Sequence, residues 1–328
     1  MKKIRYGIIG FGNFAEKTIL PAIRASANSE VVALQKRSND AAREKAGIHV
    51  VPHAVGSVEE LVRHPDVDAV FIVSANGCHH SETIAAARAG KHVLVEKPMA
   101  LSVREAEEMI RACREHGVKL MVGHMVRLSP AVARMKQLIH SGALGRVTFV
   151  KTEFIYDGRL SKRGWLRSPS VAGGGPVFDV GVHCLDTMRF LLNDEVVSVK
   201  SQLSPKPTET QTEATASLSL QFSRGTLGSI YCSYESSIRR SFIEIVGTDA
   251  LAYANDFTRC GMRVDVQIVR GNNDSEGERR IESIEVPDLY EHEVSLFSES
   301  ILTNSSIPIP GEEGLANQRV LNAAIGRS

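Results

Sequence analysis

Three short segments of the sequence carry residues whose types and spacing suit chemistry, and the first is Gly10-Phe11-Gly12-Asn13-Phe14-Ala15. It lies between a short apolar run and a helical stretch. Gly10 permits a tight turn, and Gly12 lets the backbone approach a pyrophosphate, whose charge is favoured at a helix N-terminus. Ala15 replaces a third glycine and is small enough for helix–strand packing. The segment predicts a dinucleotide site, with a ligand-free glycine turn as the alternative.

The turn after the second apolar run bears on which dinucleotide binds. An acidic residue about 20 residues after the glycines would bind the ribose hydroxyls of NAD. The sequence instead has Gln35-Lys36-Arg37-Ser38, and Asp40 lies further along. Arg37 suits an adenine face and a 2′-phosphate, and Ser38 can donate to the same phosphate. We therefore predict NADP in preference to NAD, and a solvated basic turn is the alternative.

The second segment is Glu96-Lys97-Pro98, which directly follows another apolar run. A lysine at the carboxyl end of a strand in a ligand crevice is placed to contact a bound molecule. Pro98 fixes the turn, and Glu96 can balance the lysine charge. A solvent-facing ion pair beside a turn fits the same residues.

The third segment begins with Gly173-Gly174-Gly175 and continues with helical spacing. Asp179, His183 and Asp186 fall there at i, i+4 and i+7, so they share one helix face. Three interpretations are open. The group can hold a metal, it can be a proton-transfer histidine with an orienting aspartate, or it can be a core histidine satisfied by Asp186.

The elements that must position these residues alternate along the first third of the chain. Ser57 with Glu60, and Ser102 with Glu105, match capping boxes at helix starts. Strands that alternate with helices imply right-handed crossovers and a parallel sheet that binds ligands at the carboxyl ends of its strands. The predicted strands are Ile4–Ile9, Val31–Leu34, Val67–Val73, His92–Val95 and Val118–Val122. The predicted helices include Phe14–Ser26, bent by Pro21, and His80–Ala89, ended by Gly90.

The chain changes character from Arg146 onward, where alternating segments follow one another with few strong helices between them. This pattern predicts a mostly antiparallel sheet, with Arg270–Glu278 as an exposed loop. We predict an α/β protein with a Rossmann domain, a doubly wound parallel sheet, over residues 1–124. An α+β domain with a large open sheet, for substrate binding and oligomerisation, is predicted over 125–328. The alternating segments are Val147–Tyr156, Glu213–Phe222, Thr226–Ser233 and Ser241–Val246.

Composition narrows the class of protein. The chain has 328 residues, 43% hydrophobic and 23% charged, with a net charge of +1, so charge favours neither nucleic acid nor an acidic membrane. No apolar stretch reaches the length of a membrane span, and the N-terminus has no signal-peptide pattern, so we expect a cytoplasmic protein. Five irregularly spaced cysteines suggest a reducing compartment and neither disulfides nor zinc ligands.

Taken together and in this order, the three segments resemble the glucose–fructose oxidoreductase / inositol dehydrogenase / MocA family. The resemblance covers nearly the whole chain. Ala75 departs from it, since the family often has proline there, and the chain ends slightly short of the usual tail. Further matching segments are Asn76 with His79, Arg127 with Pro130, Ser141–Gly145, Asp179-Val-Gly181-Val-His183, the Tyr290–Ile301 helix and Pro310–Gly314.

The resemblance implies a hydride-transfer enzyme that acts on a sugar, cyclitol or related polyol and forms homodimers or homotetramers through its second sheet. It assigns catalytic roles to Lys97, Asp179 and His183, and no metal. The stretch Trp165–Asp186, with the basic turn, is closer to the NADP-using sugar reductases of the family than to its NAD-using inositol dehydrogenases. The cofactor-binding residues predicted in all are Gly10, Phe11, Gly12, Asn13, Phe14, Arg37, Ser38, Ser74, Asn76, His79, Glu96, Lys97, Arg127, Trp165 and Tyr290.

The chemistry expected is proton exchange by His183, charge stabilisation by Lys97, and orientation of His183 or a substrate hydroxyl by Asp179. Three alternatives are open. They are a metal-dependent hydrolase or lyase that uses Asp179, His183 and Asp186, a non-enzymatic NAD(P)H sensor, and a family hydrolase that uses NAD to cleave glycosides.

Overall fold

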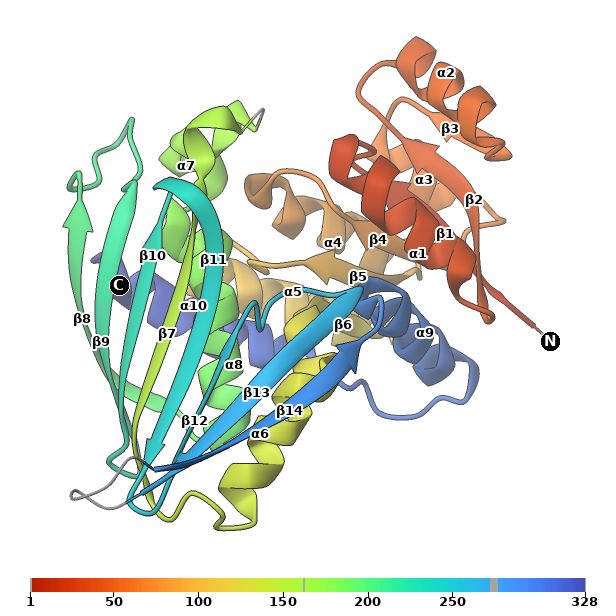
Figure 1. Cartoon of the computed structure of the whole chain (residues 1–328). Helices are drawn as coiled ribbons and strands as arrows, with labels where there is room; N and C mark the ends of the chain where they lie inside the picture. The colour runs from red at the N-terminus through yellow and green to blue at the C-terminus, as the bar shows by residue number, and fades with distance from the viewer. Residues whose placement is uncertain (1, 162, 272–276, 328) are drawn as a thin grey trace. The chain divides into compact units, whose positions relative to one another are not determined.

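The computed structural model describes residues 2–161, 163–271 and 277–327. Its internal contacts divide the chain into two units (Figure 1). The first unit comprises Met1–Gly123 and Tyr290–Gln318, and the second comprises His124–Leu289 and Arg319–Ser328. Each unit has its own β-sheet, as the sequence predicts.

The first unit contains a six-stranded sheet with the order β3-β2-β1-β4-β5-β6. All of its strand pairs are parallel. The strand order runs one way from β1 to β3 and the other way from β4 to β6. Doubly wound sheets bind ligands at such a switch point, here between β1 and β4. The strands are β1 (Ile4–Ile9), β2 (Ser29–Gln35), β3 (His53–Val55), β4 (Ala69–Ile72), β5 (His92–Glu96) and β6 (Leu120–Gly123).

Apolar side chains from the strands and the crossover helices bury one another on both faces of this sheet. On one face, Leu61, Ala86 and Met109 join strand residues in a fully buried cluster. On the other face, the Tyr6 hydroxyl is 2.8 Å from Ser298 Oγ. The helices in the first part of the chain are α1 (Leu20–Ala25), α2 (Asn39–His49), α3 (Val58–Arg63), α4 (His79–Arg88) and α5 (Val103–Glu115).

Both predicted capping boxes are present. Ser57 Oγ accepts a hydrogen bond from the backbone N–H of Glu60, and Ser102 Oγ accepts one from Glu105, each at 3.2 Å. Each glutamate carboxylate in turn accepts from the backbone N–H of the residue before its serine, at 3.2 and 2.9 Å. These bonds satisfy donors that the first turn of a helix leaves without a partner.

The helix after the glycine loop differs from the single bent helix predicted over Phe14–Ser26. It starts as a π-helical turn, Ala15–Ile19, and continues as α1. Pro21 lies in the first turn of α1, has no N–H to donate, and would crowd the carbonyl four residues earlier. A widened turn before the proline relieves that crowding.

The domain division also differs from the predicted 1–124 and 125–328. The first boundary lies one residue earlier, and Tyr290–Gln318, expected in the second domain, belongs to the first unit. The reason is the packing of α9 (Leu289–Leu302), whose Ser298 hydrogen-bonds to Tyr6 of β1. The segment also includes the start of α10 (Gly311–Ala324).

The second unit contains an eight-stranded sheet with the order β14-β13-β12-β11-β7-β10-β9-β8. Its strand pairs are antiparallel except β7–β10, which is parallel. This arrangement confirms the predicted large, mostly antiparallel sheet. The strands are β7 (Val147–Asp157), β8 (Val196–Ser204), β9 (Thr215–Phe222), β10 (Leu227–Ser233), β11 (Glu235–Gly247), β12 (Leu251–Asn255), β13 (Met262–Arg270) and β14 (Glu278–Val286).

One face of this sheet is covered and the other is open. Along β9, buried and exposed residues alternate, which is the pattern of a sheet with one face in the core. Helix α8 packs against β7, and α6 packs against α8. The helices of this unit are α6 (Pro130–His140), the short α7 (Pro169–Ala172) and α8 (Val182–Leu192). Of the predicted loop Arg270–Glu278, residues 272–276 lie outside the described residues.

Candidate functional site

The glycine loop follows β1 and allows only glycine at its first position. Gly10 has a φ of +81°, which side chains rarely adopt, and a Cβ on it would lie 2.6 Å from the Cα of Ser74. Gly12 has no such neighbour, since a Cβ there would meet nothing closer than the Gly10 carbonyl at 3.8 Å. The backbone at Gly12 is thus open to close approach by a ligand, which a pyrophosphate requires.

Two side chains of the turn after β2 hold this loop. Gln35 stands where an acidic residue is typical of NAD sites, and it is 6% exposed. Its Oε1 accepts from the backbone N–H of Gly10 at 3.1 Å, and Lys36 Nζ donates to the carbonyl of Phe11 at 2.8 Å. Gln35 and Lys36 therefore stabilise the glycine loop by hydrogen bonds to its backbone. The sequence alone does not reveal this role.

The other two residues of the turn remain available for a ligand. Arg37 is exposed and makes no ion pair with any carboxylate in the described part of the chain. Ser38 caps α2, because its Oγ accepts from the backbone N–H of Ala41 at 3.3 Å. Since the cap uses only the oxygen lone pairs, the Ser38 hydroxyl proton can still be donated.

The structure brings together two predicted cofactor residues that are far apart in sequence. The rings of Phe14 and Tyr290 meet edge to face with 5.6 Å between centroids. Phe14 is 38% exposed despite its size, and the adjacent Asn13 is also exposed. Together they present an accessible surface beside the glycine loop.

At the end of β4, Ser74 Oγ donates to Glu82 Oε2 of α4 at 2.5 Å. Burial raises the pKa of Glu82 from 4.5 to about 7, although the Ser74 hydrogen bond opposes the change. The sequence analysis did not identify Glu82, since nothing local marks it as buried.

We expect this carboxyl to make stability depend on pH. Its folded pKa is raised, so the native state keeps a proton that the unfolded state loses, and the free energy of unfolding falls as pH rises from about 4.5 to about 7. Over this pH range, the free energy of unfolding of Glu82→Gln should fall by roughly 2–3 kcal/mol less than that of the wild type. Urea unfolding of both proteins at pH 5 and pH 8 measures it.

The pH profile of the variant must be subtracted from that of the wild type, because His79 contributes to both profiles. The lowered pKa of His79 makes the free energy of unfolding rise with pH below about 6.5, opposite to the effect of Glu82. Glu59→Gln, an exposed position in α3, should behave like the wild type. Parallel pH profiles for Glu82→Gln and the wild type would contradict the prediction.

His79 lies in the interior of the first unit, 1% exposed. Its Nδ1 is 3.0 Å from the Pro98 carbonyl and its Nε2 is 3.3 Å from the Ser74 carbonyl. Burial lowers the pKa of His79 to about 4, so the ring is neutral and can donate to one carbonyl at a time. His79 thus ties together the loops after β4 and β5, with Asn76 buried one turn away.

The Glu96-Lys97-Pro98 turn follows β5, as predicted. Glu96 is 8% exposed, and its Oε2 accepts from the backbone N–H of Lys97 at 3.1 Å, which shapes the turn. Glu293 of α9 is fully buried nearby, and burial together with the charge of Glu96 raises the pKa of Glu293 well above its usual value. Lys97 itself is partly exposed.

In the second unit, Gly175 lets the chain before α8 approach the backbone of Glu213, which precedes β9. A Cβ on Gly175 would lie 1.9 Å from the Glu213 carbonyl oxygen, so no side chain fits. Glu213 Oε1 also accepts from the backbone N–H of Val177, at 3.1 Å. These contacts fix the position of the π-helical turn Val177–Gly181, which contains Asp179 and leads into α8.

Asp179 is the centre of a polar cluster. The Tyr156 hydroxyl donates to Asp179 Oδ2 at 2.6 Å, and both terminal nitrogens of Arg163 donate to the same carboxylate at 3.2 Å. Burial and the charge of Asp179 raise the pKa of Tyr156, so its hydroxyl stays protonated. The guanidinium of Arg163 also lies 5.9 Å from the ring of Trp165, another predicted site residue.

His183 lies in the first turn of α8 and is 9% exposed. Its ring centroid is 6.0 Å from that of Phe154, on the covered face of the sheet. Phe154 is in turn 6.4 Å from Tyr156, so the histidine and the Asp179 cluster share one aromatic wall. Tyr156 and Arg163 lie in the stretch Phe154–Arg167, which the sequence indicates as a source of pocket residues without singling out either side chain.

Asp186 has partners of its own. Its carboxylate accepts from Arg127 Nε and Nη2, both at 2.8 Å, and lies 3.7 Å from His124 Nδ1. Arg127 is thereby placed in a buried ion pair inside the second unit. Within the described residues, Asp179, His183 and Asp186 do not bring their ligand atoms within 4.8 Å of one another, so this geometry does not support the metal interpretation.

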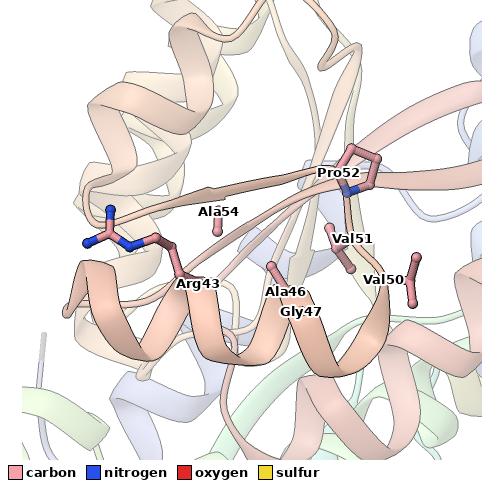
Figure 2. A pocket seen from close by; sticks show the side chains of 7 residues that line it. All are labelled: Arg43, Ala46, Gly47, Val50, Val51, Pro52 and Ala54. Carbon is pink, nitrogen blue, oxygen red and sulfur yellow. The ribbon is translucent and has the colours of Figure 1, made fainter.

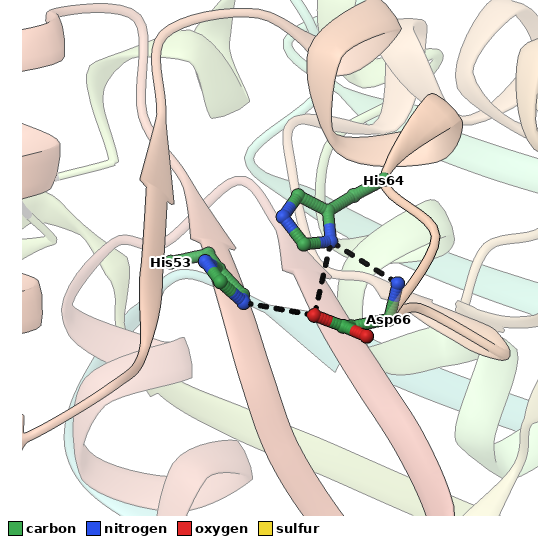
Figure 3. Close-up of side chains that lie close together, drawn as sticks. All are labelled: His53, His64 and Asp66. Carbon is green, nitrogen blue, oxygen red and sulfur yellow. Dashed lines mark hydrogen bonds and ion pairs between the residues drawn. The ribbon is translucent and has the colours of Figure 1, made fainter.

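A different trio in the described part of the chain does have the spacing of a metal site. It consists of His53, His64 and Asp66 (Figure 3). Asp66 Oδ2 is 3.2 Å from His53 Nε2 and 3.9 Å from His64 Nδ1. However, His64 Nδ1 already accepts from the backbone N–H of Asp66, and Arg5 pairs with the other carboxylate oxygen at 3.0 Å. A cation would compete with both, so hydrogen bonding explains the trio.

A surface hollow of about 490 Å³ lies beside α2 (Figure 2). It contains none of the predicted cofactor residues and no group suited to catalysis. Its lining residues are Arg43, Ala46, Gly47, Val50, Val51, Pro52 and Ala54.

Comparison with known proteins bears on the family and the fold. Residues 4–124 match the model of an oxidoreductase family with an NAD-binding Rossmann fold, and residues 132–253 match the GFO/IDH/MocA C-terminal domain. The chain is 31% identical to 1,5-anhydro-D-fructose reductase of Ensifer adhaerens, over 95% of this chain and 92% of that protein. It is 28% identical to D-xylose 1-dehydrogenase (NADP(+)) 2 of Haloferax volcanii, over 97% and 95%.

A solved structure is also similar. The aldose–aldose oxidoreductase of Caulobacter crescentus, complexed with glycerol, superposes with a TM-score of 0.87 at 26% identity, over 98% of this chain and 96% of that one. No helix among the described residues is both long and apolar enough to cross a bilayer.

Proposed function

Since the chain belongs to the GFO/IDH/MocA family of oxidoreductases, we propose that it interconverts a CH–OH group and a carbonyl in a sugar, cyclitol or related polyol, using a nicotinamide dinucleotide. The named activities of its relatives, which act on 1,5-anhydro-D-fructose and D-xylose, support this substrate class. The observation that carries the proposal is that His183 and the Asp179 cluster lie along the same aromatic wall, formed by Phe154 and Tyr156.

The residues of the glycine loop fit the cofactor. Gly10 and Gly12 would hold the pyrophosphate, and Phe14, Asn76 and Glu96 would line the remainder of the site. When bound there, the nicotinamide would supply or accept a hydride at the substrate carbon. Everything else falls to side chains of the protein.

His183 exchanges a proton with the substrate oxygen, because an imidazole titrates near neutral pH. Lys97 hydrogen-bonds the same oxygen and stabilises the negative charge that develops on it. Asp179, held by Tyr156 and Arg163, orients the imidazole or a neighbouring substrate hydroxyl. Following cofactor absorbance with a panel of aldoses, ketoses and cyclitols tests the function. A protein that binds NADPH yet converts none of them in either direction would contradict it.

We also propose NADP as the preferred cofactor, supported by the exposed Arg37, which has no carboxylate partner among the described residues. Fluorescence titration should show tighter binding of NADPH than of NADH. Arg37→Ala should weaken NADPH binding roughly tenfold to a hundredfold, the loss of a charge-assisted hydrogen bond, and change NADH binding much less. Arg43→Ala, which removes an exposed partner of Asp40, is the control. Tighter NADH binding by the wild type would overturn this preference.

We further propose a homodimer or homotetramer formed through the open face of the second sheet. Leu227 and Tyr231, both exposed large side chains of β10, support it. A cytoplasmic location is proposed as well, supported by the five free cysteines.

A further inference from the structure

Arg239 is an exposed side chain of β11 that turns onto the aromatic wall of the second unit. The β11–β7 pairing shifts register between Glu235 and Arg240, so Arg239 lies in an irregular stretch of the strand. Its guanidinium carbon lies 5.3 Å from the centroid of the Phe154 ring. An arginine at that distance over a ring face is held by a cation–π interaction.

Phe154 connects this cation to the proposed acid/base residue. The ring centroid of His183 lies 6.0 Å from that of Phe154, and the Arg239 guanidinium lies 5.3 Å from the same point, so the two are no more than about 11 Å apart. An extended six-carbon polyol, with a hydrogen bond at each end, spans about 14 Å, so it covers any separation up to that limit. One molecule can therefore present its reacting carbon to His183 and its far end to Arg239.

Three neighbouring arginines have their charges balanced by carboxylates. Arg163 is bound by Asp179, Arg159 pairs with Asp157 at 2.8 Å, and Arg240 faces Glu153 at 3.6 Å. Arg239 pairs with no carboxylate of the described ranges. Its positive charge at the end of the wall is thus available to a ligand.

Resting on the proposed function, we infer that the substrate carries an anionic group at the end remote from its reacting carbon, and that Arg239 binds this group. The substrate class is then a sugar acid or a sugar phosphate. Both present oxygens that a guanidinium fork binds through two parallel hydrogen bonds. Cation–π contact with Phe154 holds the fork in place before the substrate arrives.

The test compares glucose with glucuronate and glucose 6-phosphate, which differ from it only at the carbon farthest from the aldehyde end. Binding to the NADP-loaded protein is measured by calorimetry, and turnover by cofactor absorbance. We expect at least one anionic sugar to bind tenfold or more tightly than glucose, with an affinity that falls as salt is added. The stronger of the two identifies carboxylate or phosphate as the group recognised.

Arg239→Met should bring the affinity ratio of anionic to neutral sugar close to one, and Arg239→Lys should keep part of it. Arg167→Met is the matched control, because Arg167 is also an exposed arginine without a carboxylate partner among the described residues, and it donates to the Arg159 carbonyl. Equal binding of the three sugars by the wild type, or a ratio unchanged in Arg239→Met, would overturn the inference. Turnover of glucose in that case would leave the proposed function standing.

The converse result is equally distinct. Tight binding of an anionic sugar that depends on Arg239, with no conversion of any sugar by either cofactor, would uphold the anion site and contradict the proposed reaction.

Discussion

His183→Ala is expected to lower turnover by roughly 10²–10⁴-fold while leaving cofactor affinity nearly unchanged. The imidazole is mostly buried in the first turn of α8, beside Phe154, and belongs to the second unit, whereas the glycine loop belongs to the first. Its removal takes away the group that we propose moves a proton during hydride transfer. Single-turnover rates at saturating cofactor and sugar measure that step directly.

The control is His140→Ala, because within the described residues the His140 ring hydrogen-bonds to the Leu191 carbonyl at the end of α8 and to no other group. That variant should turn over like the wild type. A second readout separates chemistry from folding: thermal unfolding of His183→Ala should still shift when cofactor is added. Wild-type turnover by His183→Ala would remove His183 from the mechanism.

Lys97→Met should lower turnover by roughly 10²–10³-fold, the loss expected when one group that stabilises developing negative charge is removed. Methionine keeps most of the length of the side chain, and the bond from the Lys97 backbone N–H to Glu96 Oε2 is unaffected. The turn should therefore keep its shape. We expect the loss in kcat rather than in KM, because the charge is stabilised in the transition state.

Lys119→Met, near the start of β6, is the matched control, since that lysine donates to the Ser305 carbonyl away from the turn. If Lys97→Met raised KM and left kcat intact, Lys97 would be a binding residue and not a catalytic one. The double variant with His183→Ala should lose less than the product of the two single effects if both groups act on one oxygen.

Local patterns predict a large part of this molecule. β1 was predicted at Ile4–Ile9 and lies there, because a short apolar run ends at a glycine turn. The turns at Gly10 and Lys97 could be found because residues directly after parallel strands sit where ligands bind. Serines three residues before glutamates marked two helix starts.

The remainder depends on which strands and helices become neighbours. Tyr156 meets Asp179 across 23 residues of sequence, and Arg239 reaches Phe154 from a different strand. Such pairs follow from strand order and register, which no short window contains. In the sequence, Gln35 is notable only because it stands where NAD sites have an acidic residue. Its hydrogen bond to the backbone of Gly10 is evident only from the fold.

The return of α9 to the first unit has a consequence for how the protein is made. The backbone N–H of Val122 donates to the Ile309 carbonyl, and Tyr6 is buried against Ser298. During translation, Ser298 and Ile309 leave the ribosome only after strands β7 to β14 of the second unit. The dinucleotide-binding unit therefore cannot complete its packing as it emerges, and a fragment that stops near residue 124 would expose surface that the intact chain covers. We therefore expect cofactor binding to require the segment Tyr290–Gln318 as well as the first third of the chain.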